Sequence, residues 1–279
     1  MNNVENTKQL KFEAPTYRQR LKGMLGVDFY RLFHTPLFYI FLAIAAIIPA
    51  MLIAMTMMEG PNGEPAQPLF TNVWQAIAAD TPIYGFEGIE KYANMNMVFI
   101  FGGIMVSIFI GHDYKSGYVK QLFTTHAKKS DYMVSKTLTC AFAMACMCVT
   151  YLFGAIVAGA ITQTSFTCNF GKVSCAILGK ILMSLGWASL YTFLNIIFRK
   201  YFGISIASSF FFGTGILVIA VGALVGNTPV LNVFLYGSSV YACLSGSLLN
   251  VTICLIVSVI WTGIYNILGT WILEKSDVY

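Results

Sequence analysis

The sequence predicts an all-α polytopic membrane protein with six transmembrane helices. Only 10% of its 279 residues are charged and 57% are hydrophobic, whereas a soluble domain carries about 25% charged residues. The apolar residues also gather in long runs, and the stretch from Tyr201 to Leu273 contains no Asp, Glu, Lys, Arg or His. Apolar runs of about 18 residues or more are typical of transmembrane helices, so a soluble fold is excluded.

The apolar runs place the six spans at residues 37–58, 94–111, 136–161, 175–198, 203–225 and 248–272. The first run begins behind about 35 mostly polar residues, too late in the chain and too long for a cleaved signal peptide. We therefore expect three parts: a cytoplasmic N-terminal segment (1–35), a six-helix transmembrane domain (36–273) and a cytoplasmic tail (274–279).

The distribution of basic residues predicts the orientation of these spans. With the N-terminus in the cytoplasm, fourteen of the 17 Lys and Arg residues fall on the cytoplasmic side, leaving only Lys91, Lys172 and Lys180 on or near the outer side. The opposite orientation would invert this ratio, against the positive-inside rule. The sequence therefore predicts a multi-pass protein of the plasma membrane with a cytoplasmic N-terminus.

The residues from Tyr17 to His34 predict an amphipathic helix on the inner membrane surface. Leu21, Leu25, Phe29 and Leu32 share one face at helical spacing. Arg31 and the other basic residues of the segment can reach anionic headgroups. An ordinary basic flank of the first span is the alternative.

The longest predicted outer loop, residues 59–93, is acidic and rich in proline at its start. Its residues 72–80 could form a short surface helix. A hydrophilic exported loop and a vestibule that attracts cations both fit this composition. A second outer loop is flanked by Cys168 and Cys175, and the spacing alone leaves open whether these two are bridged.

Residues 226–247 are apolar, but Asn, Pro, Gly and Ser interrupt them. They could form a seventh span, although we expect a re-entrant or external hairpin between helices five and six. Irregular backbone at membrane depth is tolerated only where protein or a water-filled cavity covers it, so this segment is expected to line something.

The sequence lacks the motifs of covalent chemistry. It contains no P-loop, HExxH or GxSxG motif and no Cys/His cluster at metal-ligand spacing. We therefore expect no catalytic residue, no bound metal or cofactor and no nucleic-acid partner. The expected spans are nearly devoid of ionisable residues, and Lys180 is the one candidate for a functional group there; it either snorkels to the headgroups or has a function at membrane depth.

The predicted cytoplasmic loop 112–136 carries the most specific pattern. Asp113 closes span two, Gly117 follows, and Leu122 lies in a short amphipathic stretch. Two basic residues, Lys128 and Lys129, come next, and Tyr132 and Lys136 lead into the third span. This order resembles the coupling loop of ABC-2 type permeases, the membrane subunits of ABC exporters. Tyr118 and His126 depart from it, since that family usually has Thr and Pro there.

The resemblance covers the whole layout: a surface helix, six spans, a large first outer loop and a broken segment before the last span. It implies contact with a separate ATPase subunit through the coupling loop, at Asp113, Tyr114, Lys115, Gly117, Lys120, Leu122, Phe123, Lys128, Lys129 and Tyr132. The interface helix would add Leu21, Leu25, Phe29, Arg31 and Leu32 to this contact.

The resemblance further implies that the ATPase subunit binds ATP and Mg, so the chain is not itself an enzyme. Its other expected partners are membrane lipid and a second permease chain, in a homodimer. Within that family the resemblance leans toward small Gram-positive permeases that export amphipathic peptides, including phenol-soluble-modulin and lantibiotic systems, which implies an amphipathic or hydrophobic peptide as cargo. Export of a drug or lipid-like molecule, a non-transporting scaffold or sensor, and a membrane-embedded enzyme are the alternatives.

Overall fold

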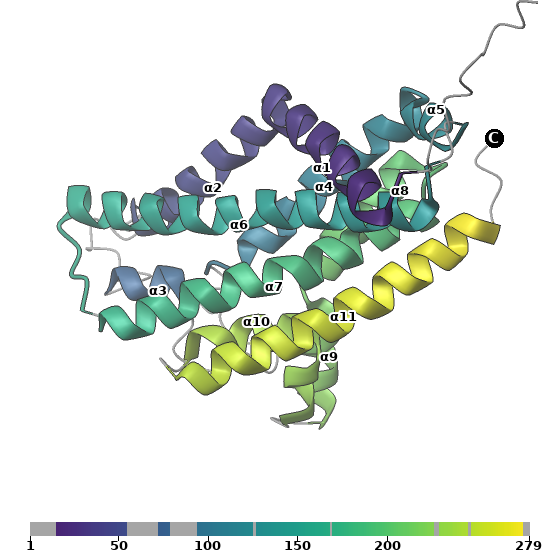
Figure 1. Ribbon diagram of the computed structural model, residues 1–279. Helices are drawn as coiled ribbons and strands as arrows, with labels where there is room; N and C mark the ends of the chain where they lie inside the picture. The colour runs from purple at the N-terminus through teal and green to yellow at the C-terminus, as the bar shows by residue number, and fades with distance from the viewer. Residues whose placement is uncertain are drawn as a thin grey trace, which may run out of the picture.

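The computed structural model describes residues 15–54, 72–78, 94–124, 127–167, 169–225, 229–244 and 247–275, and every regular element in these ranges is helical. Six of its helical segments are long and apolar enough to cross a membrane (Figure 1). The predicted all-α fold with six membrane-span helices is therefore confirmed at this level.

The described residues of the first half of the chain form α1 (Tyr17–His34), α2 (Pro36–Ala54), α3 (Val73–Ile77), α4 (Met97–Lys115), α5 (Tyr118–Thr124) and α6 (Lys129–Thr162). The second half forms α7 (Phe170–Ile197), α8 (Phe202–Gly213), α9 (Ile216–Val225), the 3₁₀ helix η3 (Pro229–Val233), α10 (Leu235–Leu244) and α11 (Leu248–Lys275).

Helix α7 lies at the centre of the bundle and packs against α11, α6, α4 and α10 (Figure 1). Helices α1 and α2 meet at an elbow, and both pack on α6. Gly154 of α6 permits the close approach of α2, because a Cβ built there would collide with the backbone oxygen of Ala46. Small residues at crossings of this kind are typical of membrane bundles.

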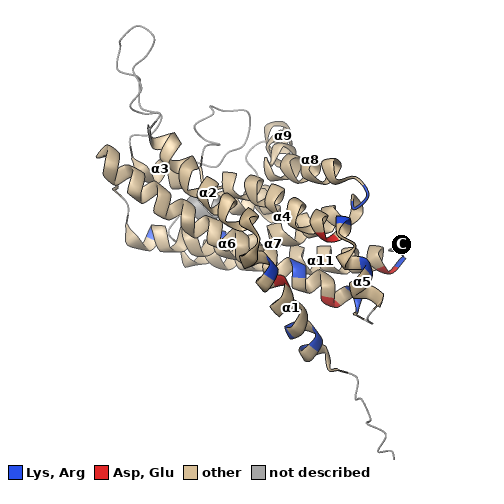
Figure 2. Cartoon of the chain, turned by 90° about the horizontal axis from the view of Figure 1, so that it is seen from above, with Lys and Arg blue, Asp and Glu red and all other residues tan. Residues whose placement is uncertain are grey.

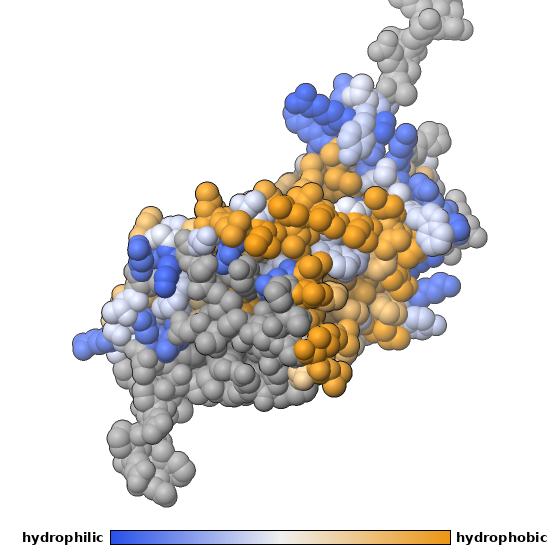
Figure 3. Space-filling model, turned by 90° about the horizontal axis from the view of Figure 1, so that it is seen from below, coloured by the Kyte–Doolittle hydropathy of each residue, from blue (hydrophilic) through white to orange (hydrophobic). Residues whose placement is uncertain are grey.

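Charged residues gather at the end of the bundle that holds α5, the start of α8 and the C-terminal end of α11 (Figure 2). All but two of the described Lys and Arg residues belong to α1 or to helix ends and turns on this side; the exceptions are Lys172 and Lys180. A broad apolar band crosses the face in Figure 3, and many large hydrophobic side chains of α8, α9 and α11 are exposed. A lipid-facing surface accounts for both features.

Several boundaries differ from the expected ones. Helix α6 begins at Lys129 rather than at 136, and α4 continues to Lys115, so the link between the two helices is shorter than the predicted loop 112–136. The fifth span is two helices, α8 and α9, which are separated by a turn where Gly215 has φ +67°. A side chain there would also collide with the ring of Tyr236.

The segment between the fifth and last spans contains η3 and the ten-residue α10, which packs against α7 and α11. Ten residues are about half of the length needed to cross the hydrocarbon core, so α10 is not a full seventh span. The rest of the predicted hairpin 226–247 lies partly outside the described residues.

Helix α3 is the described part of the predicted outer loop 59–93. Asn72 caps it by accepting a hydrogen bond from Trp74 N at 3.0 Å. The predicted short helix is present, but it is not on the surface, because its Val73, Ala76 and Ile77 are at most 1% exposed and Tyr151 of α6 donates a hydrogen bond to the Ala76 carbonyl. The acidic residues of the loop and Cys168 lie outside the described residues, so neither the vestibule nor the bridge to Cys175 is addressed.

Candidate functional site

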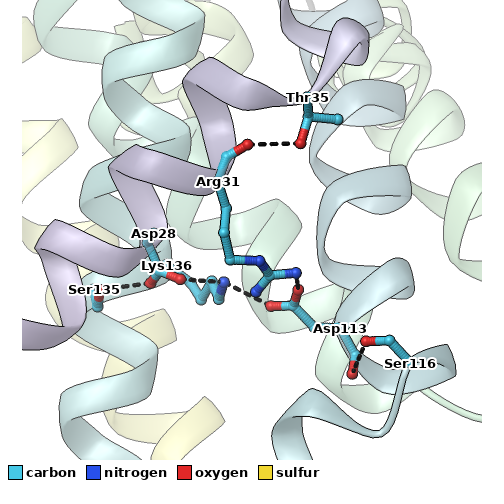
Figure 4. Close-up of polar contacts among 7 residues, drawn as sticks. All are labelled: Asp28, Arg31, Thr35, Asp113, Ser116, Ser135 and Lys136. Carbon is cyan, nitrogen blue, oxygen red and sulfur yellow. Dashed lines mark hydrogen bonds and ion pairs between the residues drawn. The ribbon is translucent and has the colours of Figure 1, made fainter.

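Four ionised side chains from three helices meet at the charged end of the bundle (Figure 4). The Lys136 ammonium on α6 lies 2.6 Å from Asp28 Oδ1 on α1 and 2.6 Å from Asp113 Oδ2 on α4. Arg31, one turn after Asp28 on α1, binds the other oxygen of Asp113. Ser135 donates a hydrogen bond of 2.6 Å to Asp28 Oδ2. We call Asp28, Arg31, Asp113 and Lys136 the charge network.

The charge network is buried and electrically neutral. Asp28, Asp113 and Lys136 are fully buried, and the Arg31 side chain is 23% exposed. Burying an ion costs several kcal/mol unless a partner of opposite charge and further hydrogen bonds offset that cost. Here two carboxylates face two cations, so removal of any single member leaves an uncompensated charge.

Aromatic rings enclose the two cations of the charge network. The Lys136 ammonium lies 4.7 Å from the centre of the Phe109 ring, and the Arg31 guanidinium lies 4.3 Å from the centre of the Tyr118 ring. Such cation–π contacts strengthen when water is excluded. Tyr118 is the first residue of α5, so this contact joins the charge network directly to the predicted coupling helix.

The electrostatic environment shifts the pKa of both groups in that contact. Burial lowers the pKa of Arg31, but Asp113 and Asp28 raise it by more, so its net shift is upward. Burial raises the pKa of the Tyr118 hydroxyl, and Asp28 adds to this shift. The contact therefore consists of a cation and a neutral ring at physiological pH.

A second ion pair ties α1 to the start of α6. The Arg20 Nε lies 2.8 Å from Asp131 Oδ2, and Asp131 is fully buried while the Arg20 side chain is 22% exposed. Helix α1 is therefore bound to α6 at both ends of its length. The predicted face of α1 does turn inward: Leu32 is buried, and Leu21, Leu25, Phe29 and Arg31 are half-buried. This face of α1 thus packs on the bundle, chiefly against α6.

Helix α5 follows a sharp turn at the end of α4. Gly117 has φ +72°, a left-handed conformation that a residue with a side chain adopts at a cost. The apolar residues of α5 then pack into a small core that includes Tyr132 and Met133 of α6 and Leu273 of α11. The ring of Phe123 contacts that of Tyr132 edge-on, with 5.7 Å between their centres. The opposite side of α5 is exposed at Lys120 and Gln121.

The predicted contact residues fall into three groups. The exposed group consists of Lys115, Lys120 and Lys128. The half-buried group consists of Tyr114, Gly117, Leu122, Phe123 and Lys129. The fully buried group consists of Asp113 and Tyr132. Lys129 donates a hydrogen bond to the carbonyl of Leu273 at the end of α11. Lys120 and Lys128 are positioned to meet another chain directly, whereas the Lys115 ammonium lies against the Phe202 ring of α8, and the buried pair supports the loop from beneath.

Lys180 does not snorkel. Its side chain is fully buried on α7, and its ammonium donates hydrogen bonds to Asn96 Oδ1 and to the carbonyl of Ser239 on α10. Trp187 donates to the Ser239 hydroxyl at 2.8 Å. Among the described residues no carboxylate contacts this ammonium. The expectation that it reaches the headgroups is therefore wrong, and Lys180 instead ties α10 to α7 and to the start of α4.

Sequence reasoning missed Asp28 and Asp131 as structural partners. Asp28 could have been suspected, because it lies on the apolar side of α1 beside Phe29, and an acid on such a face needs a cation. Their partners, Lys136 and Arg20, are more than 100 residues apart from them in the chain, and no local spacing indicates such a pairing.

Within the described residues no group of three or more His, Cys, Asp and Glu side chains could hold a metal ion. Comparison with models of known protein families gave no match for this chain. Comparison with curated proteins gave no match either. Function is therefore inferred from the chain's own residues and contacts.

Proposed function

We propose that this chain is the permease subunit of an ATP-driven exporter of the ABC-2 type, and that α5 is the helix through which a separate ATPase subunit acts on it. ATP and Mg would bind to that ATPase, and this chain would perform no covalent chemistry. Two copies, each with an ATPase, would rock against one another in the plasma membrane. The N-terminus would lie in the cytoplasm.

The observation that carries the proposal is the construction of α5. One side of this seven-residue helix is packed into the core formed with α6 and α11, and the other exposes basic and polar side chains. A loop required only to connect two spans would need neither a buried face nor a turn in the left-handed conformation that favours glycine. A short helix seated in this way can receive a push from outside and pass it to the helices beneath.

The charge network supports the same proposal. It joins α1, α4 and α6, and Tyr118 connects it to α5. These elements would move together, because separating any two of them would expose or strand a buried charge. A displacement of α5 would then reach two membrane-span helices at once.

An amphipathic or hydrophobic peptide is the cargo that best suits the chain. The six spans contain few charges, so a path between two such chains would be lined mainly by apolar side chains. Transferring polar cargo along such a surface would cost several kcal/mol for each group without a hydrogen bond.

The test begins with purification of the tagged chain from its native membranes in mild detergent. We expect an ABC-type ATPase to copurify in stoichiometric amounts. The variant Lys120→Glu/Lys128→Glu should then lower transport-linked ATPase activity several-fold, because both side chains lie where contact is expected. The helical circular dichroism should not change.

Lys172→Glu is the matched control, since it reverses an exposed charge at the opposite end of the bundle. Lys129 is left intact because it bonds the end of α11. Folded chain that brings no ATPase with it would contradict the proposal and favour a scaffold or sensor. Equal activity of the double variant and wild type would remove α5 from its assigned role.

A further inference from the structure

A small basic pocket lies between the end of α4 and the turn that joins α7 to α8. It has a volume of about 150 Å³, and its lining includes Lys115 from α4 and Arg199 and Lys200 from the turn. No Asp or Glu is among its lining residues in the described part of the chain. Three cationic side chains therefore converge on one cavity without a described acidic residue in its wall.

The floor of the pocket is polar but already satisfied. Asn195 donates hydrogen bonds to Ser107 Oγ at 3.1 Å and to the Tyr191 carbonyl at 2.8 Å, and it accepts one from Ser205. Asn195 and Ser205 are each 2% exposed. The floor is thus fixed by its own bonds, and the exposed Lys115 and Lys200 at the rim are the charges that would face a ligand.

Close packing holds the pocket in shape. The Lys115 ammonium lies 4.0 Å from the centre of the Phe202 ring, at the first turn of α8. Gly111 makes room for that ring, since a Cβ built there would collide with Phe202 Cδ2. Lys115, expected above to touch an ATPase, is thereby directed toward α8 and the pocket.

The neighbouring residues place the pocket at the level of lipid headgroups. Tyr201 is 63% exposed and stands between the basic turn and the apolar α8, and Ile204, one turn further, is 49% exposed. Exposed tyrosines at the end of an apolar helix are typical of the membrane–water interface. Basic pockets between membrane helices at this depth bind anionic lipid headgroups.

We propose that this pocket binds a phosphate-bearing anion, and that its source is the headgroup of an anionic phospholipid in the leaflet at this end of the bundle. The lipid phosphate would lie among Lys115, Arg199 and Lys200, and its acyl chains would run along the exposed apolar side chains of α8. This site is independent of the proposed coupling to an ATPase.

The test is native mass spectrometry of the purified full-length chain, titrated with phosphatidylglycerol or phosphatidylcholine of identical acyl chains. We expect one phosphatidylglycerol to bind more tightly than the others, and phosphatidylcholine to show no such site. Lys115→Gln/Lys200→Gln should weaken that binding about 30-fold, at about 1 kcal/mol for each basic residue and 1.4 kcal/mol for a factor of ten.

Arg18→Gln/Lys22→Gln is the matched control, because it removes two exposed charges from α1 on the same side. It should leave the tight site unchanged, and Lys115→Arg/Lys200→Arg should retain binding if charge rather than folding is responsible. Equal weakening by both Gln variants, or no preference for phosphatidylglycerol, would overturn the proposal.

Inorganic phosphate distinguishes the two sources of the anion. The lipid assignment requires that millimolar inorganic phosphate neither displaces the tight lipid nor raises the melting temperature of lipid-free chain. Stabilisation by phosphate alone, abolished in Lys115→Gln/Lys200→Gln, would replace the lipid by a soluble anion.

Discussion

Replacing Lys136 by Met should destabilise the chain far more than any exposed lysine does. The ammonium of Lys136 binds both carboxylates of the charge network at 2.6 Å, and its removal leaves Asp28 and Asp113 with Arg31 alone. The network then carries one uncompensated buried negative charge. Breaking a buried ion pair in this way costs about 3–5 kcal/mol. Lys22→Met, on the exposed side of α1, should change the free energy of unfolding by less than about 0.5 kcal/mol.

A second substitution should restore part of this loss. In Lys136→Met/Asp28→Asn the charges balance again, because the Arg31–Asp113 pair stays in contact and the new amide oxygen can still accept the hydrogen bond from Ser135. Coupling between contacting residues amounts to about 0.5–3 kcal/mol, so the double variant should be more stable than Lys136→Met by a value in that range.

Unfolding by dodecyl sulfate in mixed micelles, followed by circular dichroism, measures these differences. The single variants Lys136→Met and Asp28→Asn complete the double-mutant cycle. A loss for Lys136→Met no larger than that of Lys22→Met would refute the buried pairing. Strictly additive losses would show that the two side chains do not share one electrostatic site.

Helix packing and the number of spans lead to three further predictions. Gly154→Ala should destabilise the chain by about 1–3 kcal/mol, because the added carbon forces α2 away from α6. Gly263→Ala should not destabilise it, because no atom lies within 4 Å of the added carbon. Thermal melting in detergent compares the two variants. Lys180→Met should lower the free energy of unfolding by less than about 1 kcal/mol, because the cost of burying the charge disappears together with its hydrogen bonds. A larger loss in dodecyl sulfate titration would contradict this expectation. A reporter fused after Tyr279 should be active in the cytoplasm, because the described residues contain six spans and the N-terminus is proposed to be cytoplasmic; an extracellular signal would require a seventh span.

The membrane-span helices could be predicted from the sequence because the bilayer imposes a strong pattern on each span. Their number, approximate positions and all-helical character follow from apolar runs, and α1 was expected at its observed bounds. Boundaries were less predictable where polar residues are buried by protein. Helix α6 extends seven residues before its expected start, because Asp131 and Lys136 find ionic partners and can therefore remain helical and buried.

The candidate site was predictable only in part. Its loop could be located from the order of Asp113, Gly117 and Tyr132, yet the same order gave no sign that Asp113 points inward. That orientation depends on Arg31 and Lys136, which reach it from other helices. The burial of Lys180 was also beyond local reasoning, since it depends on Ser239 of α10, 59 residues further along the chain.

The lengths of α6 and α7 set the depth of the two buried lysines in the bilayer. Helix α6 has 34 residues and is about 51 Å long at 1.5 Å per residue, so a hydrocarbon core of about 30 Å leaves about 10 Å of it outside at each end. Lys136 lies about 10 Å from the start of α6, so an upright, centred α6 would place it at the edge of the core, where Asp28 and Asp113 balance its buried charge.

Lys180 lies deeper. Helix α7 has 28 residues, about 42 Å, and Lys180 is about 15 Å from its start; an upright α7 centred on a hydrocarbon core of about 30 Å would place this residue about 9 Å inside it. A charge at that depth has crossed about a third of the membrane thickness. A potential of about 100 mV across the whole membrane is worth about 2.3 kcal/mol per charge, so at this depth it changes the energy of the charge by about 0.7 kcal/mol. Any movement of α7 along the membrane normal would therefore do electrical work, whereas movement of the charge network at the edge would do little.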